Sequence, residues 1–218
     1  MAMLEIDVFW SFRSPWSYLG TARLRAMQEE WNLNVNFRPV YPIAIRTPEF
    51  FINSPPQWAP YLIVDVHRYA EFLEIPFKWP SPDPVAQYRG EDGRARTAEE
   101  QPYISRLTRL GIVAAEQGRG IEFADEVSRL IWGGQANWHL DNHLAEATAR
   151  AGLDLARMDA VVISDASRLE AAIERNQEDH ARAGHWARVN RRSARFRRPE
   201  RYLGLRVRVP ARLHRSRY

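Results

Sequence analysis

Two segments near the start of the chain alternate apolar and polar residues with the period of a β-strand. They cover residues 4–9 (LEIDVF) and 34–40 (NVNFRPV), and such alternation is typical of a strand with one buried face. Between them, Ser14 is a good N-cap and Pro15 suits the first helical position, so a helix is predicted over about 15–30. A β-α-β unit of this length predicts two parallel strands with a right-handed crossover.

The rest of the chain up to residue 186 has mainly helical spacing. Residues 41–60 are rich in proline and aromatic residues, which predicts a structured surface loop, and loops of that length usually carry function. Beyond it, apolar spacing predicts helices at about 61–74, 100–117, 121–132, 141–151, 155–163 and 167–183, with 76–84 as an irregular link. The middle of the chain is therefore predicted to be a helical block.

The composition excludes several kinds of chemistry. With 218 residues the chain can bury a core without cross-links, and its lack of cysteine excludes thiol redox catalysis, thiolate zinc sites and a cysteine nucleophile.

His139 and His143 lie four residues apart without an evident third ligand, so they predict a surface helix start and no metal site. No signal peptide or membrane span is apparent, which predicts a soluble cytoplasmic protein with no membrane association.

The net charge of +4 hides a division along the chain. Residues 187–218 hold 12 of the 31 basic residues and one acidic residue, Glu200, so this tail carries +11 and residues 1–186 carry −7. We expect one domain over 1–186, with a helical insertion at about 61–183, followed by an atypical Arg-rich tail over 187–218. A weak strand is expected over 203–209. Because periodicity ends abruptly at Ala187, we hypothesise that an altered reading frame replaces the native C-terminus.

The residues around the first predicted helix resemble those of a known family. The run Asp7–Leu19 (DVFWSFRSPWSYL) is similar to the first motif of the 2-hydroxychromene-2-carboxylate isomerase and kappa-class glutathione transferase group. This group belongs to the DsbA-like thioredoxin superfamily, in which the positions of Ser14 and Ser17 hold Cys-x-x-Cys. Further similar segments are 38–40, 53–56, 75–80 and 151–154. The resemblance covers about residues 4–186 and implies an α/β thioredoxin-like, DsbA-like fold with a large helical insertion.

The resemblance implies a glutathione-dependent isomerase that acts on a small aromatic substrate in aromatic-compound catabolism. The glutathione thiolate is expected to add reversibly to a conjugated double bond, with Ser14 as the catalytic and cofactor-binding residue that donates its hydroxyl to the sulfur. A helix N-terminus stabilises such an anion. Asn53 is expected to help hold the tripeptide, and Arg13 and Trp16 to contact the substrate; a homodimer is a further expectation. The alternative roles are an N-cap for Ser14, a turn former for Asn53, and packing or surface positions for Arg13 and Trp16.

The sequence also departs from the family pattern. Pro60, Tyr61 and Leu62 stand where a lysine is expected to meet a carboxylate of glutathione, and the cis-proline segment and two strands expected after Trp186 are not found. The C-terminal strands are therefore expected to be degraded or absent. This keeps two alternatives open: a catalytically impaired thioredoxin-fold binding protein, and anion or nucleic-acid binding through the Arg-rich tail. Nucleic acid is the less favoured partner, because few aromatic residues accompany the arginines.

Overall fold

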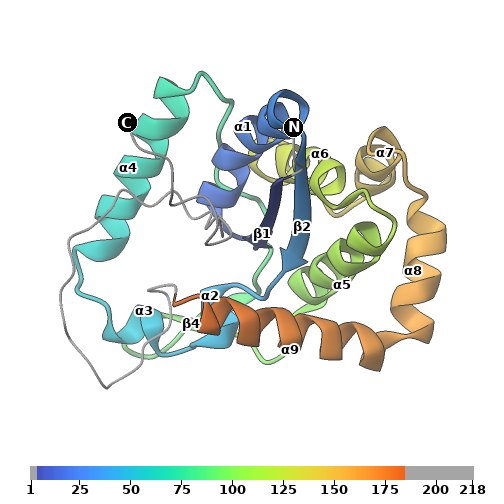
Figure 1. The fold of residues 1–218 in the computed structure, drawn as a ribbon. Coiled ribbons are helices and arrows are strands. Elements are labelled where there is room, and N and C mark those ends of the chain that lie inside the picture. The colour runs from blue at the N-terminus through green and yellow to red at the C-terminus, as the bar shows by residue number, and fades with distance from the viewer. Residues whose placement is uncertain (1–3, 185–218) are drawn as a thin grey trace.

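The computed structural model describes residues 4–184 (Figure 1). In chain order the elements are β1 (Leu4–Trp10), α1 (Pro15–Trp31), β2 (Leu33–Pro39), α2 (Ile43–Arg46), α3 (Phe50–Asn53), α4 (Trp58–Phe72), β3 (Gln87–Arg89), β4 (Ala95–Thr97), α5 (Pro102–Glu116), α6 (Gly120–Trp132), α7 (His143–Arg150), α8 (Leu155–Ser164) and α9 (Ala166–Arg182). The Arg-rich tail, the strand predicted over 203–209 and the altered C-terminus lie outside the described residues.

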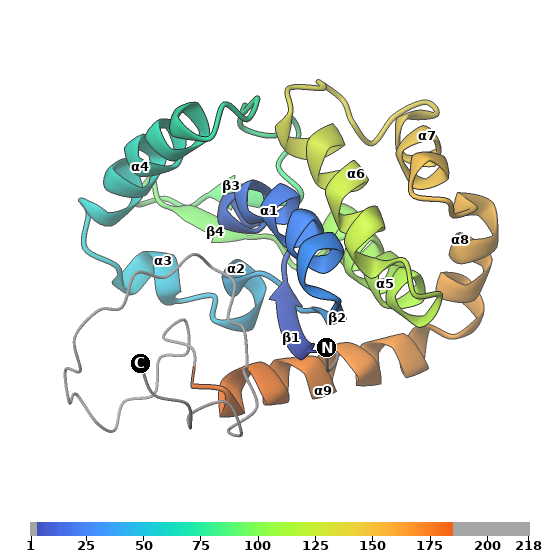
Figure 2. The ribbon, with the colours of Figure 1, turned by 45° about the horizontal axis from the view of Figure 1, so that its top comes forward.

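The predicted β-α-β opening is confirmed. β1 and β2 are parallel, and their register runs from Leu4 opposite Leu33 to Trp10 opposite Pro39. Within residues 4–184 this sheet has only these two strands. The inward side chains of β1, Ile6, Val8 and Trp10, are buried. α1, α5 and α6 contact the neighbouring strand β2, and Figures 1 and 2 show these helices beside the two strands.

The predicted helical block is also confirmed, and α5 to α9 begin and end within about three residues of the expected positions. α5 and α6 carry much of the core, with Ile104, Leu107 and Leu110 on α5 and Phe123 and Ile131 on α6 all at most 1% exposed. α9 runs along the lower side of the molecule in Figure 1 and contacts α5 and β2. We call α5 to α9, residues 102–182, the helical block.

The prediction of a structured surface loop over residues 41–60 was wrong in leaving out regular elements. This stretch contains the one-turn helices α2 and α3, and α4 begins at Trp58. A single helical turn is too short to produce a recognisable apolar period, so the pattern could not reveal it. The short hairpin of β3 and β4 was missed for a related reason. Its three-residue strands are exposed or half-buried, so they lack the alternation that a buried face imposes.

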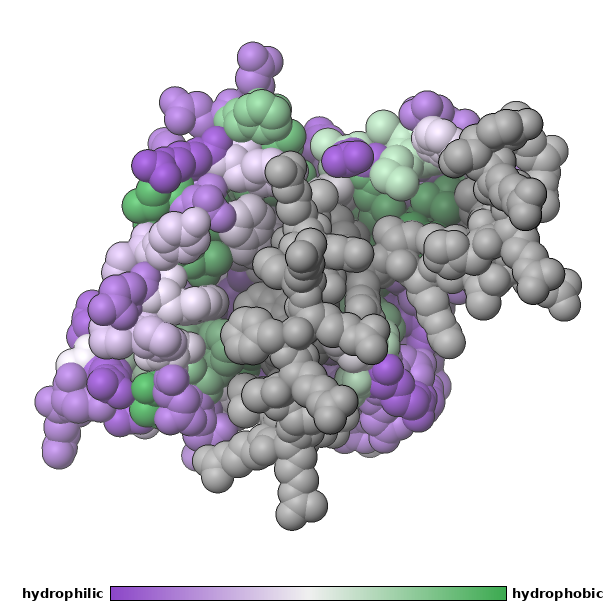
Figure 3. Space-filling view, turned by 60° about the vertical axis from the view of Figure 1, so that its left-hand side comes forward, coloured by the Kyte–Doolittle hydropathy of each residue, from purple (hydrophilic) through white to green (hydrophobic). Residues whose placement is uncertain are grey.

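α4 is packed much less tightly than the helical block. Only Val66 and Ala70 of this helix are buried, whereas Tyr61 is 70% exposed and Phe72 is 79% exposed. The space-filling view of the left-hand side of the molecule shows hydrophobic residues among hydrophilic ones on this surface (Figure 3). None of the helices within residues 4–184 combines the length and the apolar character that crossing a bilayer requires.

Candidate functional site

The connection between β1 and α1 places Ser14 at the helix N-terminus. The Ser14 N–H donates to the Ser11 carbonyl at 3.0 Å, which closes a tight turn, and the Ser17 N–H donates to Ser14 Oγ at 3.2 Å. Ser14 has an extended backbone and Pro15 occupies the first helical position, as predicted. Because Ser14 Oγ accepts this bond, its own proton remains available for donation to a ligand.

Contacts with the helical block hold this connection in place. Phe12 is 1% exposed, and its ring meets the edge of Phe123 with centroids 5.8 Å apart. The Phe12 carbonyl accepts a hydrogen bond from Trp132 Nε1 at 3.1 Å. The backbone that leads into Ser14 is therefore anchored by α6, although α6 lies more than 100 residues further along the chain.

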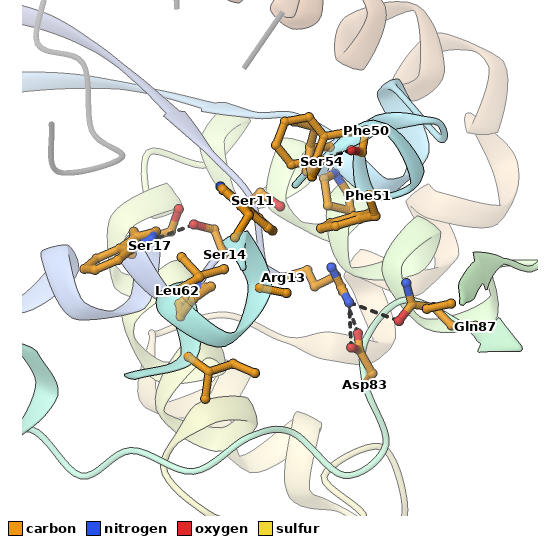
Figure 4. A pocket seen from close by; sticks show the side chains of 18 of the residues that line it. Ser11, Arg13, Ser14, Ser17, Phe50, Phe51, Ser54, Leu62, Asp83 and Gln87 are labelled. Carbon is orange, nitrogen blue, oxygen red and sulfur yellow. Dashed lines mark hydrogen bonds and ion pairs between the residues drawn. The ribbon is translucent and has the colours of Figure 1, made fainter. Parts of the chain in front are cut away.

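A cavity of about 820 Å³ opens beside Ser14 (Figure 4). Its volume falls within the range of small-molecule sites. Its wall is largely apolar and draws on α3, α4 and α6, with aromatic surface from Phe50, Phe51, Trp58, Trp79 and Trp132. An aromatic ligand of moderate size would be largely removed from water here.

Arg13 lines the cavity, but its charge is already paired. Its Nε and Nη2 donate to the two carboxylate oxygens of Asp83 at 2.8 and 2.9 Å, and Nη2 also donates to Gln87 Oε1 at 3.2 Å. The guanidinium lies over the ring of Phe51, 5.7 Å from its centroid. Its predicted contact with a substrate stays a prediction, and its structural role is to join the turn at Ser14 to the segment before β3 (Figure 4).

Trp16 and Asn53 occupy different kinds of position. Trp16 lines the cavity and packs against Tyr69 of α4, with ring centroids 5.8 Å apart. Asn53 ends α3 with an exposed side chain and is not among the residues that line the cavity, whereas the following residues Ser54 and Pro55 are. The structure thus brings Ser14, Arg13 and Trp16 to one cavity and places Asn53 at its margin.

The sequence analysis missed four charged residues of the cavity: Arg46 at the end of α2, Asp65 on α4, and Asp83 and Arg94 near β3 and β4. Arg46 Nε donates to the Tyr41 carbonyl at 2.7 Å, and burial lowers the pKa of its guanidinium. Within residues 4–184, neither Arg46 nor Asp65 belongs to an ion pair. No motif marks either residue, so only their shared position in the fold reveals them.

The site is suited to stabilising an anion at the start of α1. The Trp16 N–H is among the first-turn amides that have no acceptor within the helix, and it adds to the Ser14 hydroxyl and the partial positive charge of the helix end. These groups fit a thiolate brought in by a bound ligand. The protein has no thiol of its own to place there.

Comparisons with known proteins agree with this fold. The model of the DSBA-like thioredoxin domain matches residues 5–184, while no curated protein sequence matches the chain. A solved 2-hydroxychromene-2-carboxylate isomerase is 19% identical, with a TM-score of 0.57 over 83% of this chain and 79% of that one. A probable DsbA oxidoreductase from Streptomyces coelicolor is 16% identical, with a TM-score of 0.56 over 85% and 78%.

A third solved structure, the cytosolic disulfide reductase DsbM of Pseudomonas aeruginosa, is 17% identical, with a TM-score of 0.53 over 83% of this chain and 80% of that one. Isomerase and oxidoreductase structures are thus about equally similar, and identities this low show the fold alone. The predicted DsbA-like thioredoxin fold is confirmed, and the chain belongs to the DSBA-like thioredoxin domain family.

Proposed function

We propose that this protein is a glutathione-dependent isomerase of the 2-hydroxychromene-2-carboxylate isomerase type. The observation that carries the proposal is Ser14 at the N-terminus of α1, beside a largely apolar cavity of about 820 Å³, in a chain without cysteine. Disulfide exchange requires attack by a thiolate on a disulfide sulfur. A chain with serine at both positions 14 and 17 cannot perform that attack itself, which favours the isomerase over the oxidoreductases of the same fold.

When bound, glutathione would supply a thiolate that adds reversibly to a conjugated double bond of the substrate, so that the bond can rotate before the thiolate leaves. The protein's own residues then have three tasks. Ser14 Oγ–H and the Trp16 N–H stabilise negative charge at the sulfur. The aromatic side chains Phe51, Trp58 and Trp132 bind the substrate ring and exclude water, and the rigid turn at Ser14 keeps the reacting groups oriented.

A test of this proposal must separate the hydroxyl's role at the sulfur from its role as a helix cap. Ser14→Ala removes both, whereas Ser14→Asp keeps a good cap but places a carboxylate beside the thiolate. We expect both variants to lower glutathione-dependent isomerisation of an aryl-substituted unsaturated 2-oxo acid by about 10²- to 10³-fold, the usual loss for one donor to a developing charge. Calorimetric titration should show weaker glutathione binding by both variants.

Two controls complete this experiment. Ser17→Ala changes the neighbouring serine, which is 3% exposed, without altering the cap, and should retain most of the activity. Thermal unfolding should rank Ser14→Asp above Ser14→Ala in stability. If Ser14→Asp binds glutathione and isomerises the substrate as the unmodified protein does, Ser14 is only a helix cap and has no role at the sulfur. If the unmodified protein shows no glutathione-dependent isomerisation, the proposed function is wrong.

A binding protein without catalysis is the second candidate. It is favoured by the lack of a lysine on α4, where Pro60, Tyr61 and Leu62 stand instead. This candidate predicts that glutathione or an aromatic acid binds but that no isomerisation follows, so the kinetic arm of the same experiment separates the two functions.

A further inference from the structure

Two of the three arginines that line the cavity already have acceptors in the protein. Arg13 makes a two-point ion pair with Asp83. Arg94 donates to the Ile52 carbonyl at 3.1 Å and lies 4.0 Å from the carboxylate of Asp92. These charges are compensated within the protein, so a ligand would gain little from approaching them.

Arg46 differs from both in having no ion-pair partner within residues 4–184. One nitrogen, Nε, is fixed by the Tyr41 carbonyl, so the guanidinium is held in a defined orientation. The two terminal nitrogens have no acceptor within residues 4–184, and the side chain is only partly exposed. A guanidinium that is held in place with its terminal nitrogens unbonded can bind a carboxylate, since its parallel N–H groups match the two carboxylate oxygens.

Asp65 is an acidic residue of the cavity that, like Arg46, makes no ion pair within residues 4–184. It projects from α4 into the same cavity, is partly buried, and has no basic partner in the described part of the chain. A carboxylate among apolar side chains favours a cationic ligand group that restores the lost hydration. Arg46 and Asp65 line the same cavity from α2 and α4, so one bound ligand can contact both.

We propose that Arg46 binds a carboxylate and Asp65 the ammonium group of glutathione in this cavity. This inference rests on the proposed function and deepens it, because it names which of the chain's own residues replace the missing lysine. Glutathione carries two carboxylates and one ammonium group, and so matches an uncompensated cation and an uncompensated anion together. An aromatic 2-oxo acid carries a carboxylate but no ammonium group, and would leave Asp65 without a partner.

The test compares ligands as well as variants. Calorimetric titrations use the full chain with glutathione and with three analogues, each lacking one charge: the glutaryl analogue without the ammonium group, the 4-aminobutyryl analogue without the α-carboxylate, and the glycinamide without the C-terminal carboxylate. The variants are Asp65→Asn, which preserves side-chain shape, Arg46→Gln, which removes the charge, and Arg46→Lys, which preserves it. Arg94→Gln is the matched control, since Arg94 lines the cavity with its charge already engaged.

Asp65→Asn should bind glutathione about 10-fold more weakly and bind the glutaryl analogue as the unmodified protein does. Arg46→Gln should bind glutathione about 10- to 100-fold more weakly, the range expected for one charge-assisted hydrogen-bonded contact. Toward one of the two analogues that lack a carboxylate, Arg46→Gln should bind as tightly as the unmodified protein. The carboxylate missing from that analogue is then the one that Arg46 binds in glutathione. Arg46→Lys should recover part of the affinity, and Arg94→Gln should change it by less than about 2-fold.

Unchanged glutathione binding in both Asp65→Asn and Arg46→Gln would overturn this inference and leave the proposed function standing. An equal loss of affinity for all four ligands in these variants would also overturn it. Such a pattern indicates that the substitution damages the cavity and that the residue does not recognise a particular charge. If the unmodified protein binds none of the four ligands, both the proposed function and this inference are wrong. Circular dichroism of each variant verifies that it is folded.

Discussion

The helical block and the segment of residues 41–72 both contribute residues to the cavity wall, but they are packed differently. The helical block places several large side chains of α5 and α6 out of contact with water. The 41–72 segment, which carries α2, α3 and α4, buries only Ala44, Val66 and Ala70 in those helices. Side chains that contact many neighbours make displacement costly, whereas sparse burial keeps that cost low.

This difference divides the site into two parts with separate tasks. Ser14 is attached to the well-packed part through Phe12, Phe123 and Trp132, and its geometry is thereby fixed before any ligand arrives. Arg46 and Asp65 belong to the lightly packed part. The proposed function therefore assigns the chemistry to the well-packed side of the cavity, and the proposed contacts with the ligand's charged groups to the side that can adjust at low cost.

The largest expected effect comes from Phe123, on the rigid side. Phe123→Ala removes a ring that is 0% exposed and supports Phe12, and it should lower the free energy of unfolding by about 3–5 kcal/mol. Urea denaturation followed by circular dichroism measures this. A loss below about 1 kcal/mol would mean that the block is not the tightly packed support described above.

Tyr41 joins the two regions and should have an intermediate effect. Its hydroxyl donates to Glu170 Oε1 of α9 at 2.6 Å, and the same oxygen accepts from Arg109 Nε at 2.7 Å. Tyr41→Phe removes a hydrogen bond to a charged group and should cost about 1–2 kcal/mol in urea denaturation. An unchanged stability would show that the 41–72 segment is attached by other contacts.

The same tyrosine predicts a dependence on alkaline pH. Burial, followed by the hydrogen bond to Glu170, raises the pKa of the Tyr41 hydroxyl well above its ordinary value. In the unfolded chain it ionises near pH 10, about its usual pKa, while in the folded protein it stays protonated. Its stabilising contribution is thus complete below about pH 10 and declines as the pH rises beyond that. Tyr41→Phe should lose less stability than the unmodified protein between about pH 9 and 11, and parallel curves would contradict this assignment.

The smallest effect is expected at Phe72, on the outer surface of the 41–72 segment. This side chain is 79% exposed, and among the described residues it stacks only on Tyr69, with ring centroids 6.3 Å apart. Phe72→Ser should change the free energy of unfolding by no more than about 0.5 kcal/mol. A loss comparable to that of Phe123→Ala would remove the contrast between the two regions.

The parts of the fold that depend on local patterns were predictable from the sequence. Alternation over residues 4–9 and 34–40 reveals the two strands, and Ser14 followed by Pro15 reveals the start of α1, because burial and capping act on neighbouring positions. The short elements between 41 and 97 could not be predicted in this way. They have too few residues, and too little buried surface, to produce a period.

The sequence could not show which charged residues of the cavity form ion pairs, for a different reason. Arg13 is separated from Asp83 by 70 residues in the sequence, so its pairing depends on the tertiary fold. Arg46 matters because it makes no ion pair within residues 4–184, and no local sequence pattern can indicate a missing ion-pair partner. Sequence motifs therefore located the end of the cavity where the sulfur would lie, and the folded structure was needed to find the charges that would bind the rest of the ligand.

The tryptophans in the cavity wall allow ligand binding to be followed by intrinsic fluorescence. Trp16, Trp58, Trp79 and Trp132 all line the cavity, and the indole of Trp132 stacks on Phe77 with centroids 5.6 Å apart. Indole emission responds to the polarity around the ring, so a ligand that replaces water there should shift the fluorescence to shorter wavelength. Trp31, which is 57% exposed and does not line the cavity, supplies a steady background against which that shift can be read without any attached dye.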